Sequence, residues 1–545
     1  MSSQSIDHAA LLPLYAAAAT ALLAFLTDLF IARRPAVLAV TALGTLATAA
    51  GALLTGDRSG TFCLAGAEAC SWVPTWPAAV TAVLFAGLTA GVLALSAPAL
   101  RLGVAPAGEF CFLLACSMTG GVTVAYAGDL ITLIVGLETL TLPLYVLVGL
   151  RRFAPGERVT TDAASASVTF FLISVVSTAI ALLGAALTYA STGAVHLALL
   201  GTPPPTTAGA APGAVAPGAV APGVVAPGAV APGVVAPGAV APGAVAPDAV
   251  APGAAAPGGL EALPGGAVPA GLEAIAAVGA ALLVIGLAFK VAAVPLHAWA
   301  PATYDGAPVP VAAYLSTASK LGGILALAAI VSRLDTAIVV AVLAVLTMTV
   351  GNLVALRQTR MVRLLAWSSV AQAGYILAAL ALGAAGVVAA LAYAAFFVVL
   401  ELIAFGVVVA LRPPTADGGE LTDYRGAARR SPWLGAAMVL ALAGLAGLPP
   451  GLAGLFAKLF VVEALVQENW TWLAGVVLIN AVIALAYYVR VGALLYTAPA
   501  HADPVPAPTR PALPVPRPVA AALIGAVAVA VLLGFAPQLL FNSLT

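Results

Sequence analysis

The stretch GLAFKVAAVPLHAWAPATYDGAPVPVAAYLSTASKLGG (residues 286–323) contains two lysines, Lys290 and Lys320, inside apolar sequence. A third, Lys458, lies in the apolar segment LPPGLAGLFAKLFVVEALV (residues 448–466), and the chain has no other lysine. Apart from four histidines, all its other basic side chains are arginines. Arginine stays protonated in essentially any protein environment, whereas a buried lysine can lose its proton near neutral pH. The placement of the lysines therefore indicates proton handling inside a membrane.

The composition is that of a membrane protein. Of the 545 residues, 62% are hydrophobic and only 8% are charged, whereas soluble domains carry roughly 25% charged residues. The net charge is zero, so nothing in it suggests a nucleic-acid partner. The N-terminal sequence MSSQSIDHAALLPLY lacks a basic region and a small-residue cleavage motif. It is therefore predicted to begin the first spanning helix rather than to form a cleaved signal peptide.

Hydropathy predicts an all-α polytopic membrane fold with about 14 transmembrane helices. A spanning helix needs about 20 apolar residues, and this length sets the predicted helices. They are 9–31, 36–54, 76–98, 108–127, 130–150, 163–190, 272–296, 309–331, 336–356, 364–383, 386–411, 432–466, 470–497 and 518–541. Prolines interrupt the seventh helix at Pro295 and the twelfth at Pro449 and Pro450.

Arginine placement predicts the orientation, because cytoplasmic loops carry an excess of Lys and Arg. With an extracytoplasmic N-terminus and an even number of helices, only Arg58 and Arg333 fall in extracytoplasmic loops. Fifteen arginines fall in cytoplasmic loops: Arg33, Arg34, Arg101, Arg151, Arg152, Arg158, Arg357, Arg360, Arg363, Arg412, Arg425, Arg429, Arg430, Arg510 and Arg517. Both termini are therefore predicted to be extracytoplasmic.

Residues 202–270 interrupt the helical pattern with the repeat APGAV or APGVV, at a period of five from Ala211 onward. Recurrent Pro and Gly exclude a helix because each removes or weakens helical hydrogen bonds. In lipid the freed backbone groups would be unsatisfied. We predict a flexible, turn-rich or polyproline II-like insert between helices six and seven on the extracytoplasmic side. A neutral expansion of a tolerant loop and a role such as surface adhesion both stay open.

The four cysteines form two different pairs. Cys63 and Cys70 lie in a polar loop on the side predicted to be extracytoplasmic, where a disulfide could form. Cys111 and Cys116 lie in an apolar helix and are expected to pack in the core. Neither pair has histidine partners at ligand spacing, so zinc and iron–sulfur sites are not expected.

Each lysine inside a predicted helix requires an explanation, because a charge at a helix centre costs about 2.5–3.5 kcal/mol on insertion scales. Lys320 has about eleven residues on either side in its helix, or roughly 16 Å, too far for the side chain to reach the headgroups. Lys290 and Lys458 lie beside proline breaks, where the backbone can line a hydrated cavity. We predict a functional role for all three, with buried structural pairing as the alternative.

Three further polar residues join the candidate site. Glu138 lies in the middle of its helix and is the predicted acidic partner of a lysine, since an ion pair favours both charged forms. A structural salt bridge is the alternative. Glu401 is also within a predicted span, as a proton site or a structural residue. His297 could relay protons between the lysines or could order its loop by hydrogen bonding.

The two interrupted helices predict two related halves, because transporters often carry discontinuous helices at corresponding positions of paired half-structures. Lys290 and Lys458 would then be equivalent. The predicted divisions are residues 1–107 for helices one to three, 108–331 for the first half-channel (interrupted by 202–270), 336–498 for the second half-channel and 518–541 for the C-terminal helix.

Several motifs closely resemble subunit N of the proton-pumping NADH:quinone oxidoreductase, respiratory complex I. They are the stretch 286–323, GLETLTLPLY (136–145), RLLAWSSVAQAGY (363–375) and GLAGLPPGLAGLFAKLF (444–460). The resemblance covers nearly the whole chain outside the insert. It implies an antiporter-like fold of fourteen helices with two inverted five-helix repeats.

The resemblance also implies roles for the charged residues. Glu138 and Lys290 would form the charged pair of the first half-channel, Lys320 the central relay and Lys458 the terminal lysine of the second. The chain departs from the family at three positions: Ala302 follows Pro301 where Asp is usual, Gln372 stands where His is frequent, and Glu401 stands where an uncharged residue is expected.

The sequence thus predicts a proton-translocating membrane subunit of a type I NADH dehydrogenase. It contains no flavin, NAD or iron–sulfur motif, so NADH, FMN, iron–sulfur clusters and quinone are expected in partner subunits. The expected partners are other membrane subunits of complex I and, through them, the peripheral NADH-oxidising arm. The expected location is the bacterial inner (plasma) membrane. The alternatives are a subunit of a multisubunit cation/proton antiporter or membrane-bound hydrogenase, and a stand-alone solute transporter.

Overall fold

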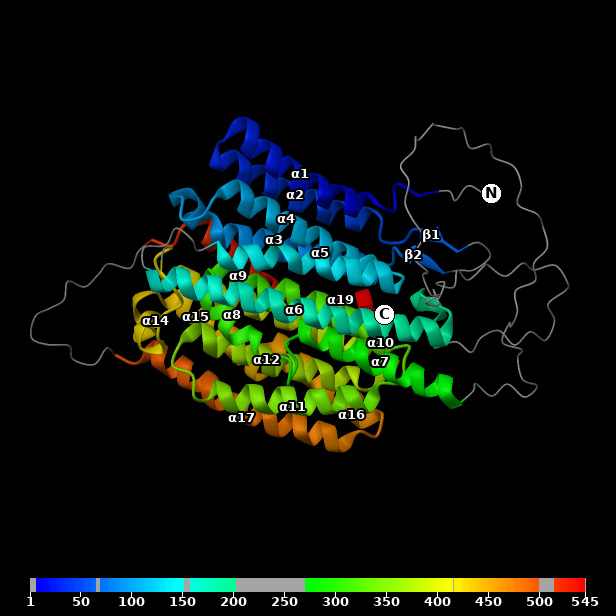
Figure 1. Cartoon of the computed structure of the whole chain (residues 1–545). Coiled ribbons are helices and arrows are strands. Elements are labelled where there is room, and N and C mark those ends of the chain that lie inside the picture. The colour runs from blue at the N-terminus through cyan, green and yellow to red at the C-terminus, as the bar shows by residue number, and fades with distance from the viewer. Residues whose placement is uncertain are drawn as a thin grey trace, which may run out of the picture. The chain divides into compact units, whose positions relative to one another are not determined.

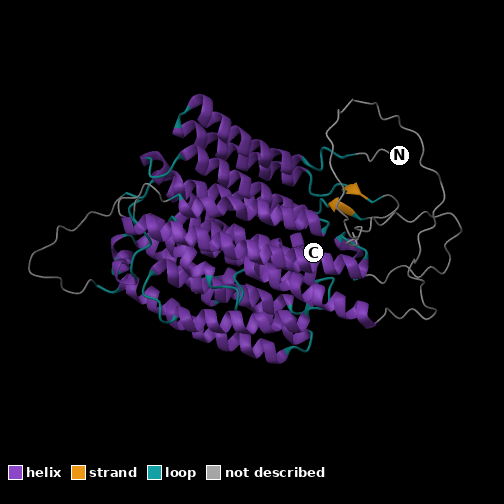
Figure 2. Cartoon of the chain, viewed as in Figure 1, coloured by secondary structure: helices purple, strands orange, loops and turns teal. Residues whose placement is uncertain are grey.

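The computed structural model describes residues 6–64, 69–150, 157–201, 270–414, 416–498 and 514–544 (Figure 1). These residues are almost entirely helical (Figure 2). Twelve helices or continuous helix runs among them are long and apolar enough to cross a membrane. Six helices have a proline at their first or second residue, and proline has no N–H to leave unpaired in the first turn. The predicted all-α polytopic fold is confirmed.

The long helices follow the predicted segments, with ends shifted by a few residues. In chain order they are α1 (Leu12–Ile31), α2 (Arg34–Leu54), α3 (Trp76–Leu102), α4 (Ala107–Tyr126), α5 (Leu130–Gly149), α6 (Glu157–Thr192), α7 (Ala270–Lys290), α11 (Ala337–Ala355), α12 (Met361–Leu380), α13 (Val387–Leu411), α17 (Thr471–Tyr496) and α18 (Arg517–Phe535). A short helix, α19 (Gln538–Leu544), follows α18.

The seventh predicted helix is broken, although not where the sequence placed the break. Helix α7 ends at Lys290, and the chain resumes as the short helix α8 (Trp299–Gly306). Ala292 has a left-handed φ of 57°, and the Val294–Pro295 peptide bond is cis. The predicted continuation to residue 296 is therefore wrong, because the chain leaves the helix before it reaches the proline.

The twelfth predicted helix is broken at its two prolines, as expected. Its halves are α15 (Pro432–Ala446) and α16 (Leu452–Gln467), and the Pro449–Pro450 bond between them is cis. The first half stops at Gly447, whose φ of 83° is easily adopted only by glycine. Neither half alone is long enough to span, so this pair and the less apolar α12 complete the fourteen predicted spans.

The eighth predicted helix contains a π-helical turn. Helix α9 (Val309–Tyr314) continues through the π segment η3 (Leu315–Ser319) into α10 (Lys320–Val331). Lys320 is the first residue after this turn. Single π turns inside α-helices occur frequently at functional sites.

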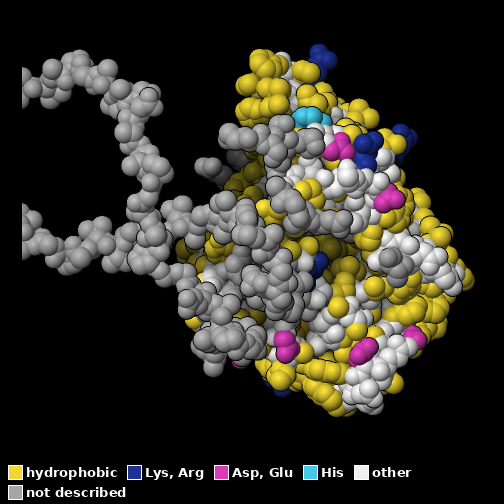
Figure 3. Space-filling model, turned by 90° about the vertical axis from the view of Figure 1, so that its right-hand side faces the viewer, with side chains coloured by type: hydrophobic (Ala, Val, Ile, Leu, Met, Phe, Trp, Pro, Cys, Tyr) yellow, Lys and Arg dark blue, Asp and Glu magenta, His cyan; other side chains and the backbone are white. Residues whose placement is uncertain are grey.

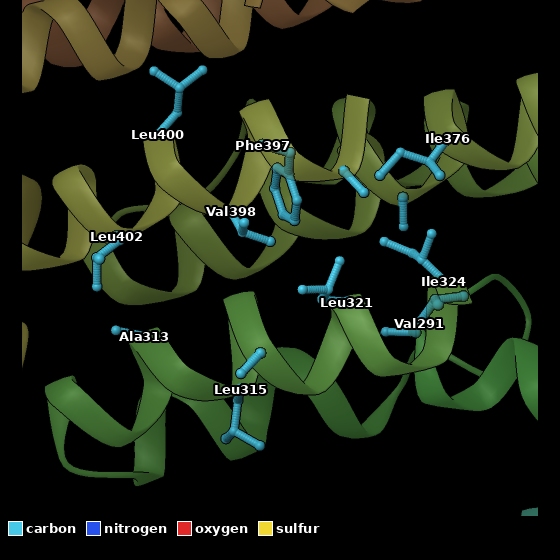
Figure 4. Close-up of a cluster of buried hydrophobic side chains, with 14 of the residues drawn as sticks. Val291, Ala313, Leu315, Leu321, Ile324, Ile376, Phe397, Val398, Leu400 and Leu402 are labelled. Carbon is cyan, nitrogen blue, oxygen red and sulfur yellow. The ribbon is translucent and has the colours of Figure 1, made fainter. Parts of the chain in front are cut away.

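Helix α13 occupies the centre of the bundle. Nearly all its residues from Ala389 to Val408 are buried, and it packs against α9 and α10 on one side and α12, α15, α16 and α18 on the others. Figure 4 shows Phe397 and Val398 of α13 in the space between that helix and Leu321 of α10. Helix α13 therefore joins the elements that carry Lys320 to the elements that carry Lys458.

A small hairpin extends from one end of the helices, at the right of Figure 1. Strands β1 (Thr61–Cys63) and β2 (Cys70–Trp72) pair antiparallel, and a disulfide joins Cys63 to Cys70. The disulfide that the sequence allowed is thus present. In the other pair Cys111 is fully buried, as expected of a core residue.

Loops predicted on one side of the membrane are joined to one another. The Arg34 guanidinium donates to the Arg101 carbonyl oxygen, and Arg360 and Arg412 both pair with Asp417. At the other end Arg58 pairs with Asp7. Figure 3 views the hairpin end, where charged side chains are few and hydrophobic ones cover much of the periphery. The predicted insert lies outside the described residues except for Ala270, the first residue of α7.

Candidate functional site

Glu138 and Lys290 form an ion pair inside the bundle. Glu138 lies in the middle of α5, Lys290 is the last residue of α7, and the Lys290 Nζ to Glu138 Oε1 distance is 2.7 Å. The lysine side chain is only 4% exposed and the glutamate 24%. The predicted partnership is present in the structure, although the two residues are 152 positions apart in sequence.

Hydroxyl groups surround this ion pair. The Lys290 ammonium also donates to Ser174 Oγ at 3.0 Å and to Thr141 Oγ1 at 3.3 Å. The Thr178 hydroxyl donates to Glu138 at 2.6 Å, and the Tyr145 hydroxyl donates to Ser174 at 2.5 Å. Ser174, Thr178 and Tyr145 are site residues that the sequence did not predict. The one sequence feature that could have identified them is a hydroxyl side chain in an otherwise apolar helix. Such side chains are common in membrane helices, so this feature has little specificity.

The break after Lys290 leaves backbone groups that side chains satisfy. The Trp299 indole N–H donates to the Phe289 carbonyl oxygen at 3.2 Å, and the Thr347 hydroxyl oxygen accepts from the Val294 N–H at 2.9 Å. Irregular backbone at membrane depth is tolerated only where protein or water supplies such partners. These two bonds hold the break in place and thereby fix Lys290 at the end of its helix.

Lys320 is completely buried in the middle of the bundle. Its ammonium donates to the Ser369 carbonyl oxygen of α12 at 2.5 Å. None of the hydroxyl residues just before it in sequence bonds it. Ser316 bonds the Ser369 hydroxyl at 2.9 Å, and Thr317 bonds the Ala313 carbonyl oxygen of its own helix. The central lysine is therefore held by the second half of the chain.

A glycine allows the helix that carries Lys320 to lie close to Lys290. Gly323 lies one turn after Lys320, and a Cβ added to it would lie only 3.0 Å from the Cβ of Lys290. Helix α10 thus carries Lys320 in one turn and, in the next turn, packs through Gly323 against the stem of Lys290.

Lys458 uses the helix break in a different way. It lies in α16 and donates to the carbonyl oxygens of Leu445 at 2.7 Å and Ala446 at 2.8 Å, the last residues of α15. Helix-end carbonyls lack partners in their own helix and carry partial negative charge. The ammonium also lies 4.9 Å from the ring centroid of Tyr375. The break is therefore the binding site of this lysine.

Gln372 links the central lysine to the terminal one. Its Nε2 donates at 2.9 Å to the Leu445 carbonyl oxygen, the same atom that accepts from Lys458. It lies three residues after Ser369, on the same face of α12. Its amide also bonds the hydroxyls of Tyr488 and Tyr393. A polar row on α12 therefore runs from Lys320 to Lys458, and Gln372 keeps a fixed hydrogen-bonding role without a titrating ring.

The remaining two predicted residues differ in placement. Glu401 is completely buried on α13 and interacts electrostatically with Lys320. His297 lies beside the backbone of Pro295 and the ring of Trp367, and none of its described contacts reaches a lysine. Of its two proposed roles, ordering of the loop fits these contacts better. Among the described residues, no group of three His, Cys, Asp or Glu side chains could hold a metal ion.

A family model described as NADH:quinone oxidoreductase/Mrp antiporter, TM matches residues 127–211 and 270–484, more than half of the chain. The chain belongs to this family. A relative from Salinispora tropica, named NADH-quinone oxidoreductase subunit N, is 52% identical over 99% of this chain and 98% of its own. A second, from Streptomyces griseus, named NADH-quinone oxidoreductase subunit N 2, is 37% identical over 98% and 92%. The resemblance to subunit N is confirmed.

Solved structures of this family share the fold. A chain of respiratory complex I from Thermus thermophilus matches with a TM-score of 0.69 and 25% identity, over 97% of this chain and 98% of its own. A chain of the Mrp complex from Dietzia matches with a TM-score of 0.75 and 21% identity, over 99% and 96%. This antiporter-family chain is therefore a membrane subunit of a multisubunit complex, and it spans the membrane many times.

Proposed function

We propose that this chain moves protons for an NADH:quinone oxidoreductase along a path from Lys290 through Lys320 to Lys458. One observation carries the proposal: all three lysines are buried in the bundle along α10 and α12. Lys290 packs against Gly323 of α10. Lys320 bonds Ser369 of α12, and Lys458 shares the Leu445 carbonyl oxygen with Gln372 of the same helix. Glu138 supplies the countercharge at the beginning of the path. The residues 108–331 and 336–498 would act as its two half-channels.

The contacts suggest how a proton is released from the first lysine. The Lys290 ammonium is stabilised by Glu138, Ser174 and Thr141. If Glu138 turns away or takes a proton, a buried ammonium loses its countercharge, which is energetically costly. The lysine then gives up its proton to the next acceptor. Reversal of the movement restores the pair and draws a new proton.

The energy for this movement would come from partner subunits. In the proposed complex, NADH, FMN, iron–sulfur clusters and quinone all lie outside this chain. Electron transfer there would shift the Glu138–Lys290 pair through neighbouring membrane subunits. The complex would lie in the bacterial inner membrane, with the arginine-rich loops in the cytoplasm and both termini on the other side.

A cation/proton antiporter subunit is the second candidate, because the Mrp complex chain shares the fold. At 21% identity that likeness concerns the fold alone. The relative at 52% identity carries the name of subunit N, which favours the oxidoreductase. Purification of the native complex distinguishes the two, since NADH-oxidising subunits should accompany this chain.

The direct test is Lys290→Ala in the whole complex. NADH-driven proton uptake into inverted membrane vesicles should fall, while NADH oxidation by an artificial acceptor shows that the complex assembles. Wild-type proton uptake in an assembled Lys290→Ala complex would refute the proposal.

A further inference from the structure

Glu401 is a buried acid that the proposed path does not use. It lies on the central helix α13, ten residues before the last residue of that helix, or roughly 15 Å from its end. The side chain is completely buried, and neither carboxyl oxygen has a hydrogen-bond partner among the described residues. Buried polar groups are almost always paired, because an unpaired one is costly. A carboxyl in this setting therefore requires a chemical reason.

Lys320 lies opposite this carboxyl. Its ammonium has three donors, and among the described residues it bonds the Ser369 carbonyl oxygen alone. The ammonium lies 5.9 Å from the ring centroid of Phe397, one helical turn before Glu401 on the same face of α13. The two charges interact electrostatically, although their atoms do not meet within the 4.0 Å of an ion pair. Lys320 and Glu401 thus form a separated pair rather than a salt bridge.

Hydroxyl groups lie around this separated pair. The Ser316 side chain is in the π segment η3 and donates to the hydroxyl of Ser369, whose carbonyl oxygen accepts from Lys320. The Tyr304 hydroxyl of α8 is also buried, and it has no hydrogen-bond partner among the described residues. Hydroxyls both donate and accept, so they can carry a proton between the two charged groups.

We propose that Glu401 is a second proton-holding residue of this chain, which exchanges one proton with Lys320. In this step the Lys320 ammonium gives up one proton and the Glu401 carboxylate takes up one. One N–H bond breaks, one O–H bond forms at Glu401, and the summed charge of the pair stays zero. A proton can therefore wait at the centre of the bundle without leaving an unpaired buried charge. This inference rests on the proposed function and adds a residue to it.

The test is Glu401→Gln in the whole complex, which keeps the shape of the side chain and removes the proton site. Proton transfer through this chain should slow by about a hundredfold or more, as for loss of a general acid–base group. The number of protons taken up per NADH oxidised should then fall by the number that this chain translocates. The infrared difference between resting and NADH-reduced complex should lose the carbonyl stretch of a buried carboxylic acid. Glu463→Gln, the same change at an exposed position of α16, is the matched control and should change neither measurement.

Unchanged proton uptake and an unchanged infrared band in Glu401→Gln would overturn the inference. If Glu401→Gln does not assemble, Glu401→Leu replaces it, because leucine suits the apolar surroundings. Proton uptake and the infrared band are then compared with those of the wild-type complex. Failure of both variants to assemble would assign Glu401 a structural role and would also overturn it. The function proposal fails separately, since it requires a loss of proton uptake in Lys290→Ala whatever the result at Glu401.

Discussion

Replacement of Glu138 by Gln tests the first step of the path most sharply. The change leaves Lys290 within reach of Ser174 and Thr141 but removes its only described countercharge. Loss of one partner of a buried ion pair costs about 3–5 kcal/mol, and about 1.4 kcal/mol corresponds to a factor of ten. Because Glu138 is 24% exposed, the lower value applies. The charged form of Lys290 should therefore become about a hundredfold less favourable relative to the neutral amine.

The consequence is measured in inverted membrane vesicles that oxidise NADH. Proton uptake, followed by quenching of an acridine dye, should fall strongly in Glu138→Gln. The amount of assembled complex, measured by NADH oxidation with an artificial acceptor, should be retained. Glu273→Gln makes the same chemical change at an exposed position near the start of α7 and should pump normally. Wild-type proton uptake in Glu138→Gln would refute the reasoning that this pair controls the first step.

Three other predictions concern the second half of the chain and the hairpin. Lys458→Met should reduce NADH-driven proton uptake and leave the Leu445 and Ala446 carbonyls without their ammonium partner, at about 1–3 kcal/mol each. Normal uptake in the assembled variant would contradict it. Gly447→Ala should cost about 1–3 kcal/mol of stability, because φ at this position is 83° and the new Cβ would lie 2.8 Å from Lys458 Cδ. The temperature of thermal inactivation should therefore fall. Gly475→Ala is the control, because a Cβ there meets no atom within 4 Å, and it should leave that temperature unchanged or raise it. An equal fall in the inactivation temperature of both variants would contradict the role given to φ at Gly447. Cys63 and Cys70 should react with a membrane-impermeant thiol reagent in spheroplasts only after reduction, and labelling only from the cytoplasmic side would overturn the predicted orientation.

The helices could be predicted because the membrane imposes a simple rule on sequence. Every backbone polar group in lipid must be bonded within its own segment, so each span is a long apolar run. The break of α15 and α16 at Pro449 and Pro450 followed from the same rule. The break after Lys290 was misplaced, because a left-handed Ala292 ends α7 before Pro295 is reached. A left-handed alanine has no sequence signal, since it depends on the contacts around it.

The candidate site was predicted in its charged members and missed in its uncharged ones. Charges in apolar helices stand out in a sequence, because burial of a charge is costly. Ser174 and Thr178 do not stand out, because Ser and Thr hydroxyls in helices often bond the backbone of their own helix. His297 shows the opposite limit, since a histidine near the lysines in sequence makes its described contacts with Pro295 and Trp367.

The sequence by itself determined that this chain is a many-helix membrane protein, that three lysines and Glu138 lie within its spans, and that two helices are broken. These properties depend on one-dimensional patterns of hydropathy, charge and proline. Only the tertiary structure decided that Glu138 meets Lys290, that helix-end carbonyls hold Lys458 and that Glu401 faces Lys320 without touching it. Those pairings join residues that are far apart along the chain, and they depend on how α5, α10, α12 and α13 pack. Packing geometry, not local sequence, sets which buried charges can share a proton.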